Sequence, residues 1–227
     1  MITFGGRFDT YSLPADLRPE PHQRDNLALS LLAMETFLGR PLPPPERILP
    51  ALELARVPGR TQLLEEPGLH PVILDGAHNP DGMEALGKSL RARFPGRRVL
   101  ALFSIMRDKD YISVYRAVRG FSAAVGFVPL EGKYPRALPF SGLQAALPPA
   151  ERGDIRLFPL SSESLIALLR VSDAPREINP LPALDKPFPL FDLLVVCGSL
   201  YLLGEVIPLL LPHYRALEWF RQFAGED

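Results

Sequence analysis

Residues 193–211 read LLVVCGSLYLLGEVIPLLL, and the interpretation of this run decides the class of fold. An apolar segment of this length approaches that of a helix that spans a membrane. However, Glu205 lies near its middle, and Pro208 would interrupt the helical hydrogen bonds. We therefore expect a buried strand, a turn at residues 198–199 and an apolar helix, and we expect no membrane partner.

The same order of strand, polar loop and helix recurs in the preceding part of the chain. The runs VLALF (99–103) and LLVVC (193–197) are apolar without alternation, which is typical of strands buried on both faces. This succession favours an α/β fold with a mostly parallel sheet and helices on both faces. We expect strands at 61–65, 71–75, 98–103, 123–128, 155–158 and 192–197, and helices at 80–94, 110–119, 141–147, 162–171 and 199–211.

An amphipathic helix is predicted over residues 25–38. Its apolar residues recur at helical spacing, at Leu27, Leu31, Met34 and Leu38. Besides this helix, we expect only a weak strand, at residues 7–13, before residue 40. These two elements have too few partners to bury the apolar face of the helix. The front of the chain is therefore typical of the end of another domain.

A proline-rich run, RPLPPP at residues 40–45, separates this part from the rest. Proline fixes φ and has no N–H to donate, so the preceding helix cannot continue through it. We therefore expect a first domain of residues 1–45 and a second of residues 46–227, which begins with a short helix. Five prolines within residues 172–190 predict an irregular loop, and residues 214–223 predict an amphipathic tail helix.

The composition excludes several classes of function. The 227 residues include 25 basic and 26 acidic side chains and no long basic run, so we expect no nucleic-acid partner. The one cysteine, Cys197, cannot form an internal disulfide, which favours a reducing compartment and a cytoplasmic location. The four histidines are scattered, so we predict no metal ligands in this sequence.

Polar loops follow three of the predicted strands. They are DGAHNP (75–80), SIMRDKD (104–110) and GSLY (198–201). In open parallel sheets, ligands bind beyond the carboxyl ends of the strands, where these loops lie. A carboxylate at this edge, such as that of Asp75, can accept both hydroxyls of a ribose. These loops are therefore the candidate functional site.

Local structure offers an alternative explanation for each loop. Asn79–Pro80 is a favoured pair for a helix start, and Ser199 is equally a cap of the last core helix. The segment RDKD (107–110) is equally an exposed loop with an aspartate cap. Arg60 is a cation at a predicted turn, which suits contact with a phosphate but is not specific to it. From the residues alone, both interpretations remain open.

A phosphate-loop pattern, GxxxxGK[ST], matches residues 82–89 (GMEALGKS). That loop requires a strand directly before its first glycine and a helix that opens at the lysine. Here the preceding strand ends at Asp75, and Pro95 would cut short a helix that opened at Lys88. Since the apolar face of a helix continues through the segment, we interpret the match as coincidental.

Six segments carry a resemblance to a known family: HQRDNLALSLLA (22–33), PGR (58–60), ILDGAHNPDGMEAL (73–86), RDKD (107–110), PRALP (135–139) and CGSLYLLGE (197–205). In this order they resemble the bifunctional dihydrofolate synthase/folylpolyglutamate synthase family, part of the Mur ligase superfamily. The resemblance covers the carboxy-terminal part only. It implies that residues 1–45 hold the end of an ATPase domain and that residues 46–227 form a Rossmann-like domain.

The resemblance also implies a role for individual residues. ATP would be bound by Gln23 and Asn26 near the adenine, Arg60 at the phosphates, Asp75 at the ribose hydroxyls, and His78 beside the nucleotide. One departure is visible, because Thr61–Gln62 follow PGR where an aromatic residue and an acid are common in the family. This departure concerns the start of the strand rather than Arg60.

Further residues are implied in catalysis and near the substrates. Arg60 and Lys109 would be the catalytic side chains, and Ser104 and Ser199 would lie near the cleft where a folate meets glutamate. The family's phosphate loop, its Mg²⁺ ligands and its modified lysine would lie upstream of Met1.

The implied reaction is ATP-dependent amide formation in folate biosynthesis and one-carbon metabolism. ATP would phosphorylate a carboxylate of dihydropteroate or of a folate, and the amine of L-glutamate would displace the phosphate. This chain would supply the adenosine clamp, and the missing ATPase domain would act in cis or in trans, so we expect the isolated chain to be inactive. The alternatives are a non-catalytic nucleotide-binding or interaction module left by truncation, or one subunit of a split synthase.

Overall fold

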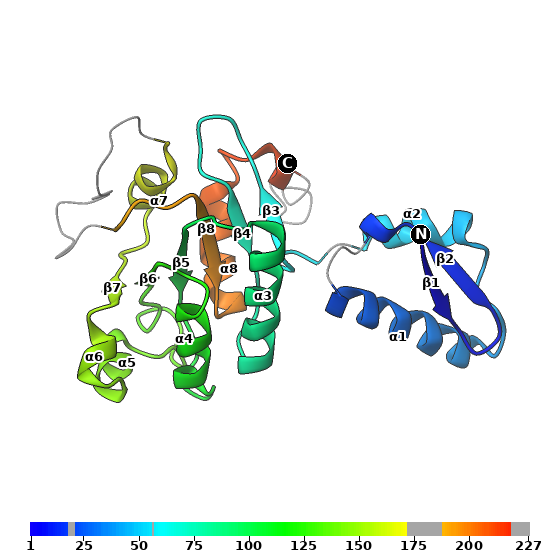
Figure 1. Ribbon diagram of the computed structural model, residues 1–227, viewed down its shortest axis with the longest axis horizontal. Helices are drawn as coiled ribbons and strands as arrows, with labels where there is room; N and C mark the ends of the chain where they lie inside the picture. Colours follow the sequence, from blue (N-terminus) through cyan, green and yellow to red (C-terminus); the bar gives the residue numbers. More distant parts are fainter. Residues whose placement is uncertain (18–20, 56, 172–187, 219–227) are drawn as a thin grey trace. The chain divides into compact units, whose positions relative to one another are not determined.

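The computed structural model describes residues 1–17, 21–55, 57–171 and 188–218 (Figure 1). Its contacts divide the chain into two compact units, Met1–Val57 and Pro58–Asp227. Most of the loop expected at 172–190, and the tail beyond residue 218, lie outside the described residues. Where the tail helix was expected to begin, the structure has a short 3-10 helix, Arg215–Leu217.

The larger unit is built on a six-stranded sheet with the order β3-β4-β8-β5-β6-β7. The edge strand β3 runs antiparallel to β4, and every other neighbouring pair is parallel. The expectation of a mostly parallel sheet is therefore confirmed. The strands are β3 (Gln62–Leu64), β4 (Val72–Leu74), β5 (Val99–Phe103), β6 (Ala124–Phe127), β7 (Ile155–Leu157) and β8 (Leu193–Cys197).

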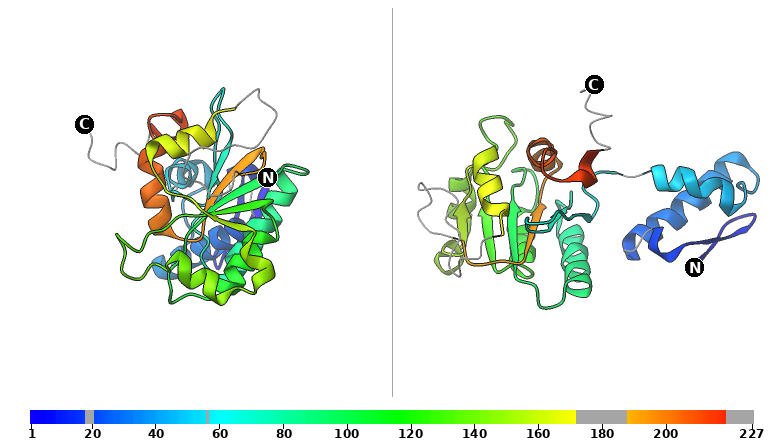
Figure 2. Two further views of the ribbon diagram at one scale, coloured as in Figure 1. Left: turned by 90° about the vertical axis from the view of Figure 1, so that its left-hand side faces the viewer. Right: turned by 90° about the horizontal axis from the view of Figure 1, so that it is seen from above.

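Helices cover both faces of this sheet, as Figure 2 shows in its left view. Successive side chains of a strand alternate between the two apolar clusters, so Ile73 packs with one and its neighbours in β4 with the other. One face is covered by α3 (Pro80–Arg93), α4 (Tyr111–Arg119) and α5 (Phe140–Ala146), and the other by α7 (Ser162–Leu169) and α8 (Leu200–Leu210). A short helix, α6 (Pro149–Arg152), precedes β7.

This alternation explains why the central strands carry no polar residues. The non-alternating runs predict buried side chains at Val72, Ile73, Leu74, Val99, Leu100, Leu102, Leu194, Val195 and Val196. All nine are at most 5% exposed, which confirms the prediction. A side chain on either face of these strands leaves water, so each position selects an apolar residue.

The apolar run at residues 193–211 breaks where expected. Strand β8 ends at Cys197, and the Ser199 hydroxyl accepts a hydrogen bond from the Tyr201 N–H at the start of α8. Gly198 makes the turn with a φ of 100°, and a Cβ there would lie 2.3 Å from the Ser104 carbonyl oxygen. Only glycine fits this backbone and this space. In the described part of the chain, no helix has the length and apolar character needed to cross a bilayer.

We expect Gly198→Ala to lower the free energy of unfolding by about 2–4 kcal/mol, because it adds both backbone strain and a steric clash. Urea denaturation followed by circular dichroism measures this loss. Gly204→Ala is the matched control, since Gly204 lies in α8 and a Cβ there meets no atom within 4 Å. That variant should be at least as stable as the wild type, because alanine favours helices. Equal losses in both variants would contradict the role of the turn.

The smaller unit pairs a β-hairpin with two helices. Strands β1 (Ile2–Gly5) and β2 (Thr10–Leu13) are antiparallel, and a short 3-10 helix, η1 (Ala15–Leu17), leads to α1 (Pro21–Leu38). Of the weak strand expected at 7–13, only residues 10–13 form a strand, because residues 6–9 form the hairpin turn. Strand β1 was not predicted.

Helix α2 (Pro45–Leu54) also belongs to the smaller unit. Its residues Ile48, Leu49 and Leu52 pack against the unit's apolar cluster. The proline-rich run predicted a boundary between residues 45 and 46, whereas the compact units divide after Val57. The proline-rich run ends α1, but the chain then turns back to cover the hairpin. The proline-rich run therefore marks the end of a helix and not the end of a compact unit.

Helix α1 carries the exposed apolar surface that its sequence predicted. Leu27 and Leu31 are buried, but Met34 and Leu38, which were expected on the same face, are 41% and 45% exposed. The next buried position after Leu31 is instead Glu35. Apolar side chains therefore remain on the outside of the helix, of which Phe37 is the most exposed, at 91%.

Glu35 is buried because it satisfies the turn of the hairpin. Its carboxylate accepts hydrogen bonds from the backbone N–H groups of Arg7 and Phe8 and from the Tyr11 hydroxyl. Tyr11 in turn accepts from the Leu42 N–H at 2.8 Å. Burial by itself raises the pKa of Glu35, but these hydrogen bonds outweigh it, so its pKa lies below the ordinary value.

A lowered pKa in the folded state means that Glu35 stabilises the fold above its unfolded pKa, about 4.3, and that this contribution is lost as the pH falls further. We expect Glu35→Gln to destabilise the smaller unit at pH 7. The variant should also lose less stability than the wild type as the pH falls to 3.5. Amide signals of Tyr11 and Leu31, followed during urea titrations at pH 7 and pH 3.5, measure both effects. The control is Asp25→Asn, at an exposed position of the same helix. If the two variants behaved alike, the buried carboxylate would not hold the hairpin.

Candidate functional site

The carboxyl ends of the parallel strands meet along one edge of the sheet. Strand β8 lies between β4 and β5 and pairs with both in parallel. The loops that begin at Asp75, Ser104 and Gly198 therefore emerge side by side. They are joined directly, because the Gly198 N–H donates to the Ala77 carbonyl at 2.8 Å and the Ser104 N–H donates to the Cys197 carbonyl at 3.4 Å.

The edge strand β3 brings a fourth segment to the same edge. Because β3 is antiparallel to β4 and pairs Gln62 with Leu74, the residues that precede β3 lie opposite the loop that follows β4. The Gly76 N–H donates to the Gly59 carbonyl at 2.7 Å, which fastens the two segments. Arg60, exposed at this turn, is thereby brought to the edge that carries Asp75.

The Asp75 carboxylate is the centre of this edge. It is 6% exposed and accepts three hydrogen bonds from the protein. The N–H and the hydroxyl of Thr61 donate to Oδ2 at 2.8 and 3.0 Å, and the Ala77 N–H donates to Oδ1 at 2.7 Å. The carboxylate therefore joins the turn at residues 58–61 to the loop after β4.

Close packing with α8 requires a glycine in this turn. Gly59 has a φ of 69°, and a Cβ on it would lie 2.1 Å from the Leu203 side chain. Its N–H donates to the Gln62 side-chain oxygen at 3.2 Å, and this glutamine stands where the family commonly has an acid. The start of α8 therefore supports the turn that carries Arg60.

His78 is half-buried beside this centre. Its Nδ1 lies 2.8 Å from the Gly76 carbonyl oxygen, to which the protonated nitrogen donates. In the neutral ring, this leaves Nε2 as the acceptor. The capping interpretation of the adjacent residues is confirmed, since the Asn79 side chain accepts from the Gly82 N–H at 2.8 Å and Pro80 opens α3.

The loops after β5 and β6 are fastened to each other. The Arg107 N–H donates to the Arg136 carbonyl at 2.8 Å, and the Leu138 N–H donates to the Ile105 carbonyl at 2.9 Å. Lys109, which was predicted to be catalytic, lies half-buried in the first of these loops. The two segments quoted in the sequence, at 107–110 and 135–139, thus lie together at the edge of the sheet.

Three further polar groups lie at or near this edge, and they differ in their environments. Asp110 caps α4, and its pKa lies below the ordinary value because the side chain and the backbone N–H of Ser113 donate to its carboxylate. Cys197 is fully buried, and this burial raises the pKa of its thiol. Ser104 is fully buried, and its hydroxyl has no hydrogen-bond partner among the described residues.

Two features of the site were not predicted from the sequence. Thr61 appeared only as a departure from the family pattern, and its hydrogen bonds to Asp75 could not be read from local spacing. The second is Glu205, which accepts from the Lys133 ammonium at 2.8 Å and from the Tyr134 hydroxyl at 2.5 Å. These contacts hold the loop after β6 against α8. The position of Glu205 in an otherwise apolar helix was the one signal of a partner.

Gln23 and Asn26 lie in the other unit. Both are on α1, where Gln23 is half-buried and Asn26 is exposed. The structure brings the other predicted site residues together at one edge of one sheet. They are Arg60, Asp75, His78, Ser104, Lys109 and Ser199.

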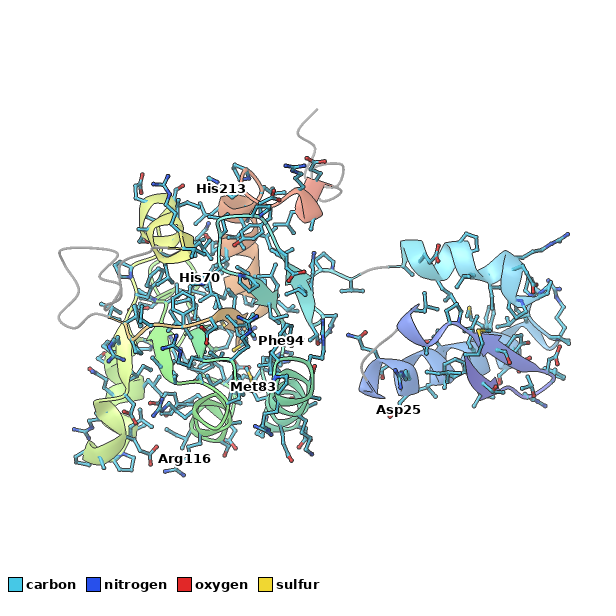
Figure 3. The ribbon with its side chains drawn as sticks, turned by 45° about the horizontal axis from the view of Figure 1, so that its top comes forward. Asp25, His70, Met83, Phe94, Arg116 and His213 are labelled. Carbon is cyan, nitrogen blue, oxygen red and sulfur yellow. The ribbon has the colours of Figure 1, made fainter. Side chains whose placement is uncertain are left out.

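The phosphate-loop pattern at 82–89 is coincidental, as expected. The whole segment lies inside α3, and Met83 points from this helix into the core (Figure 3). Lys88 forms an ion pair with Glu84 at 2.7 Å on the exposed side of the helix. The backbone N–H groups of this segment are therefore engaged in helical hydrogen bonds and cannot cradle a phosphate.

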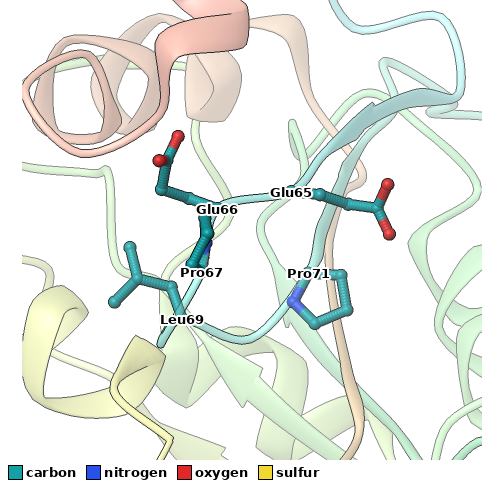
Figure 4. Close-up of a pocket in the computed structure, with 5 residues that line it drawn as sticks. All are labelled: Glu65, Glu66, Pro67, Leu69 and Pro71. Carbon is teal, nitrogen blue, oxygen red and sulfur yellow. The ribbon is translucent and has the colours of Figure 1, made fainter.

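A shallow hollow lies at the opposite edge of the sheet, by the β3–β4 hairpin (Figure 4). It is lined by Glu65, Glu66, Pro67, Leu69 and Pro71. Glu66 is paired with Arg215, at 3.4 Å, and Glu65 is exposed. No group of three or more potential metal ligands occurs in the described part of the chain.

Comparison with known proteins defines the class to which this fold and this edge belong. The family described as "Mur ligase, glutamate ligase domain" matches residues 59–177. The match begins at the turn that carries Arg60. It covers the loops at residues 75–80 and 104–110 and ends before the loop at 198–201. The chain belongs to this family.

The relatives narrow the class. The dihydrofolate synthase/folylpolyglutamate synthase of Bacillus subtilis (strain 168) is 36% identical over 119 residues, which is 51% of this chain and 26% of that protein. The folylpolyglutamate synthase of Lacticaseibacillus casei is 29% identical over 187 residues, which is 82% of this chain and 37% of that protein. The resemblance carried by the six sequence segments is therefore confirmed.

A solved structure supports the fold. The folylpolyglutamate synthase of Mycobacterium tuberculosis, complexed with ADP and AMPPCP, superposes with a TM-score of 0.66 at 24% identity. The superposition covers 90% of this chain and 43% of that one. The chain thus spans between about a quarter and less than half of the length of these relatives.

We expect Asp75→Asn to lower the free energy of unfolding by about 2–4 kcal/mol, because an amide has one acceptor oxygen and places a donor against N–H or O–H groups that already donate. Urea denaturation measures the loss. Asp81→Asn is the control, at an exposed position in the first turn of α3. It should cost at most about 1 kcal/mol, the interaction of a carboxylate with the helix dipole. A similar small cost at Asp75 would show that the three hydrogen bonds contribute little.

Proposed function

We propose that this chain is the carboxy-terminal part of an ATP-dependent ligase that adds L-glutamate to dihydropteroate or to folates. The observation that carries the proposal is the pair of hydrogen bonds between Asp75 and Thr61, the residue that follows Arg60. It lies at the ligand-binding edge of a Mur ligase domain whose named relatives are such synthases. The chain's own contribution is an adenosine clamp and a cation for the phosphates.

In this proposal each site residue has one task. The guanidinium of Arg60 lies at an exposed turn and neutralises charge on the ATP phosphates, for which its planar donor array is suited. The Asp75 carboxylate accepts from the ribose, and the open Nε2 of His78 faces the nucleotide. Gln23 and Asn26 approach the adenine.

The chemistry requires a carboxylate, a nucleophile and a leaving group. A folate or dihydropteroate carboxylate attacks the γ-phosphorus of ATP, and ADP leaves. The amine of L-glutamate then attacks the acyl phosphate, the new amide bond forms, and phosphate leaves with the electron pair of the broken C–O bond. Lys109 stabilises developing negative charge, and Ser104 and Ser199 lie near the cleft where these substrates meet. Closure of the site excludes the water that would hydrolyse the acyl phosphate.

The proposal assigns the remaining phosphate chemistry to a part of the enzyme beyond these residues. Backbone N–H groups that cradle phosphates, and carboxylates that hold Mg²⁺, supply most of the stabilisation in phosphoryl transfer. Among the described residues, the phosphate-loop pattern lies within a helix and no metal-ligand cluster occurs. Mg²⁺ would therefore be held by an ATPase domain supplied in cis or in trans.

The exposed apolar face of α1 favours such a partner over a self-contained binding module. Leu29 is 65% exposed and Phe37 is 91% exposed, although both are large apolar side chains. Exposed apolar surface of this kind is covered in a stable assembly. The ATPase domain is the partner that we propose, either as part of a longer protein or as the other subunit of a split synthase.

We expect the purified chain to show no folate–glutamate ligase activity and to bind ATP with a Kd in the roughly millimolar range or weaker. Activity should appear when an ATPase-domain half is added in trans. It should then fall by roughly 100-fold or more with Asp75→Ala or Arg60→Ala, since each removes a charged contact to the nucleotide. The assay is ADP release that depends on both glutamate and a folate.

Lys88→Ala is the control for this experiment, because Lys88 lies on the exposed side of α3 in an ion pair with Glu84. It should leave the reconstituted activity unchanged. Robust turnover by the chain alone that is lost in Lys88→Ala would overturn the proposal and restore residues 82–89 as a phosphate site.

A further inference from the structure

Thr61 combines backbone strain with two hydrogen bonds to a single oxygen. Among the described residues it is the only one other than glycine with a positive φ, of 50°, and it is 6% exposed. A β-branched residue in this region of φ is strained and persists only where its surroundings hold it there. The N–H and the hydroxyl of Thr61 both donate to Asp75 Oδ2, at 2.8 and 3.0 Å.

These contacts leave little acceptor capacity on Asp75. A carboxylate offers about four lone-pair positions, two on each oxygen. Thr61 occupies both positions on Oδ2, and the Ala77 N–H occupies one on Oδ1 at 2.7 Å. One position remains, on Oδ1. A ribose presents two adjacent hydroxyls, and a carboxylate with both oxygens open would accept one on each.

We propose that Thr61 is a positioning residue that restricts Asp75 to one of the two ribose hydroxyls. This inference rests on the proposed function, in which Asp75 holds the ribose of the nucleotide. The site then distinguishes the 2′-hydroxyl from the 3′-hydroxyl, because only one of them donates to the open position on Oδ1. This inference revises the expectation from the sequence that Asp75 accepts hydrogen bonds from both ribose hydroxyls.

The test compares ADP with 2′-deoxy-ADP and 3′-deoxy-ADP. Each is titrated into the 227-residue chain, and the amide signals of Thr61 and Ala77 are followed by NMR. One deoxynucleotide should bind within about two-fold of ADP, because the missing hydroxyl has no partner on Asp75. The other should bind roughly ten-fold more weakly, because it lacks the donor to a charged acceptor. Equal losses of affinity for the two deoxynucleotides would overturn the proposal, and this outcome can be read from the wild-type chain alone.

Two substitutions at Thr61 assign the effect to its hydroxyl. Thr61→Ala removes the hydroxyl and its volume and so opens a second position, on Oδ2, and both deoxynucleotides should then bind more weakly than ADP. Thr61→Ser retains the hydroxyl and should restore the one-sided preference. A loss of packing alone would weaken all three nucleotides together and would leave their ratios unchanged. If Thr61→Ala kept the one-sided preference, the proposed role of the hydroxyl would be wrong.

Asp75→Ala separates this inference from the proposed function. If ADP causes no shifts in the wild type, or binds equally to Asp75→Ala, then the ribose site and the inference both fail. If Asp75→Ala weakens ADP binding but the two deoxynucleotides lose affinity equally, the ribose site stands and only the inference about Thr61 fails.

Discussion

The burial of β8 on both faces is the constraint on which the larger unit depends. All five of its residues are buried, and it pairs in parallel with β4 on one side and β5 on the other. Parallel neighbours place their carboxyl ends at one edge, so the sheet gathers the loops that contain Asp75, Ser104 and Ser199. The burial of apolar side chains, which is not directional, thereby determines where the polar side chains of the candidate site lie.

Buried carboxylates fasten turns in both units. Glu35 accepts from the N–H groups of the hairpin turn and from Tyr11, and Asp75 accepts from Thr61 and Ala77. In each case, an acid at a position that otherwise suits an apolar residue satisfies donors that burial would leave unpaired. The two carboxylates differ in location: Asp75 lies among the loops at the carboxyl ends of the parallel strands, whereas Glu35 lies in the smaller unit. The same device thus stabilises one unit and, in our proposal, selects a ligand in the other.

Agreement between sequence and structure was closest where the pattern was local. The break at Gly198, the cap at Asn79 and the helix through residues 82–89 depend on neighbours within a few positions. Predictions were wrong where a distant contact decided. Met34 and Leu38 are exposed because Glu35 occupies the buried position, and α2 covers the hairpin rather than opening the second unit.

The sequence by itself determined the order of the six strands and the main helices of the larger unit, the α/β class, the resemblance to the family and the three loops that carry the candidate site. Apolar periodicity and turn residues encode these features, because both reflect the local geometry of strands and helices. Only the tertiary structure decided that Thr61 meets Asp75, 14 residues away in the chain, and that Arg60 is thereby carried to the same edge. That contact depends on the antiparallel pairing of β3 with β4, which no local pattern specifies, because register is set by the whole sheet and its core.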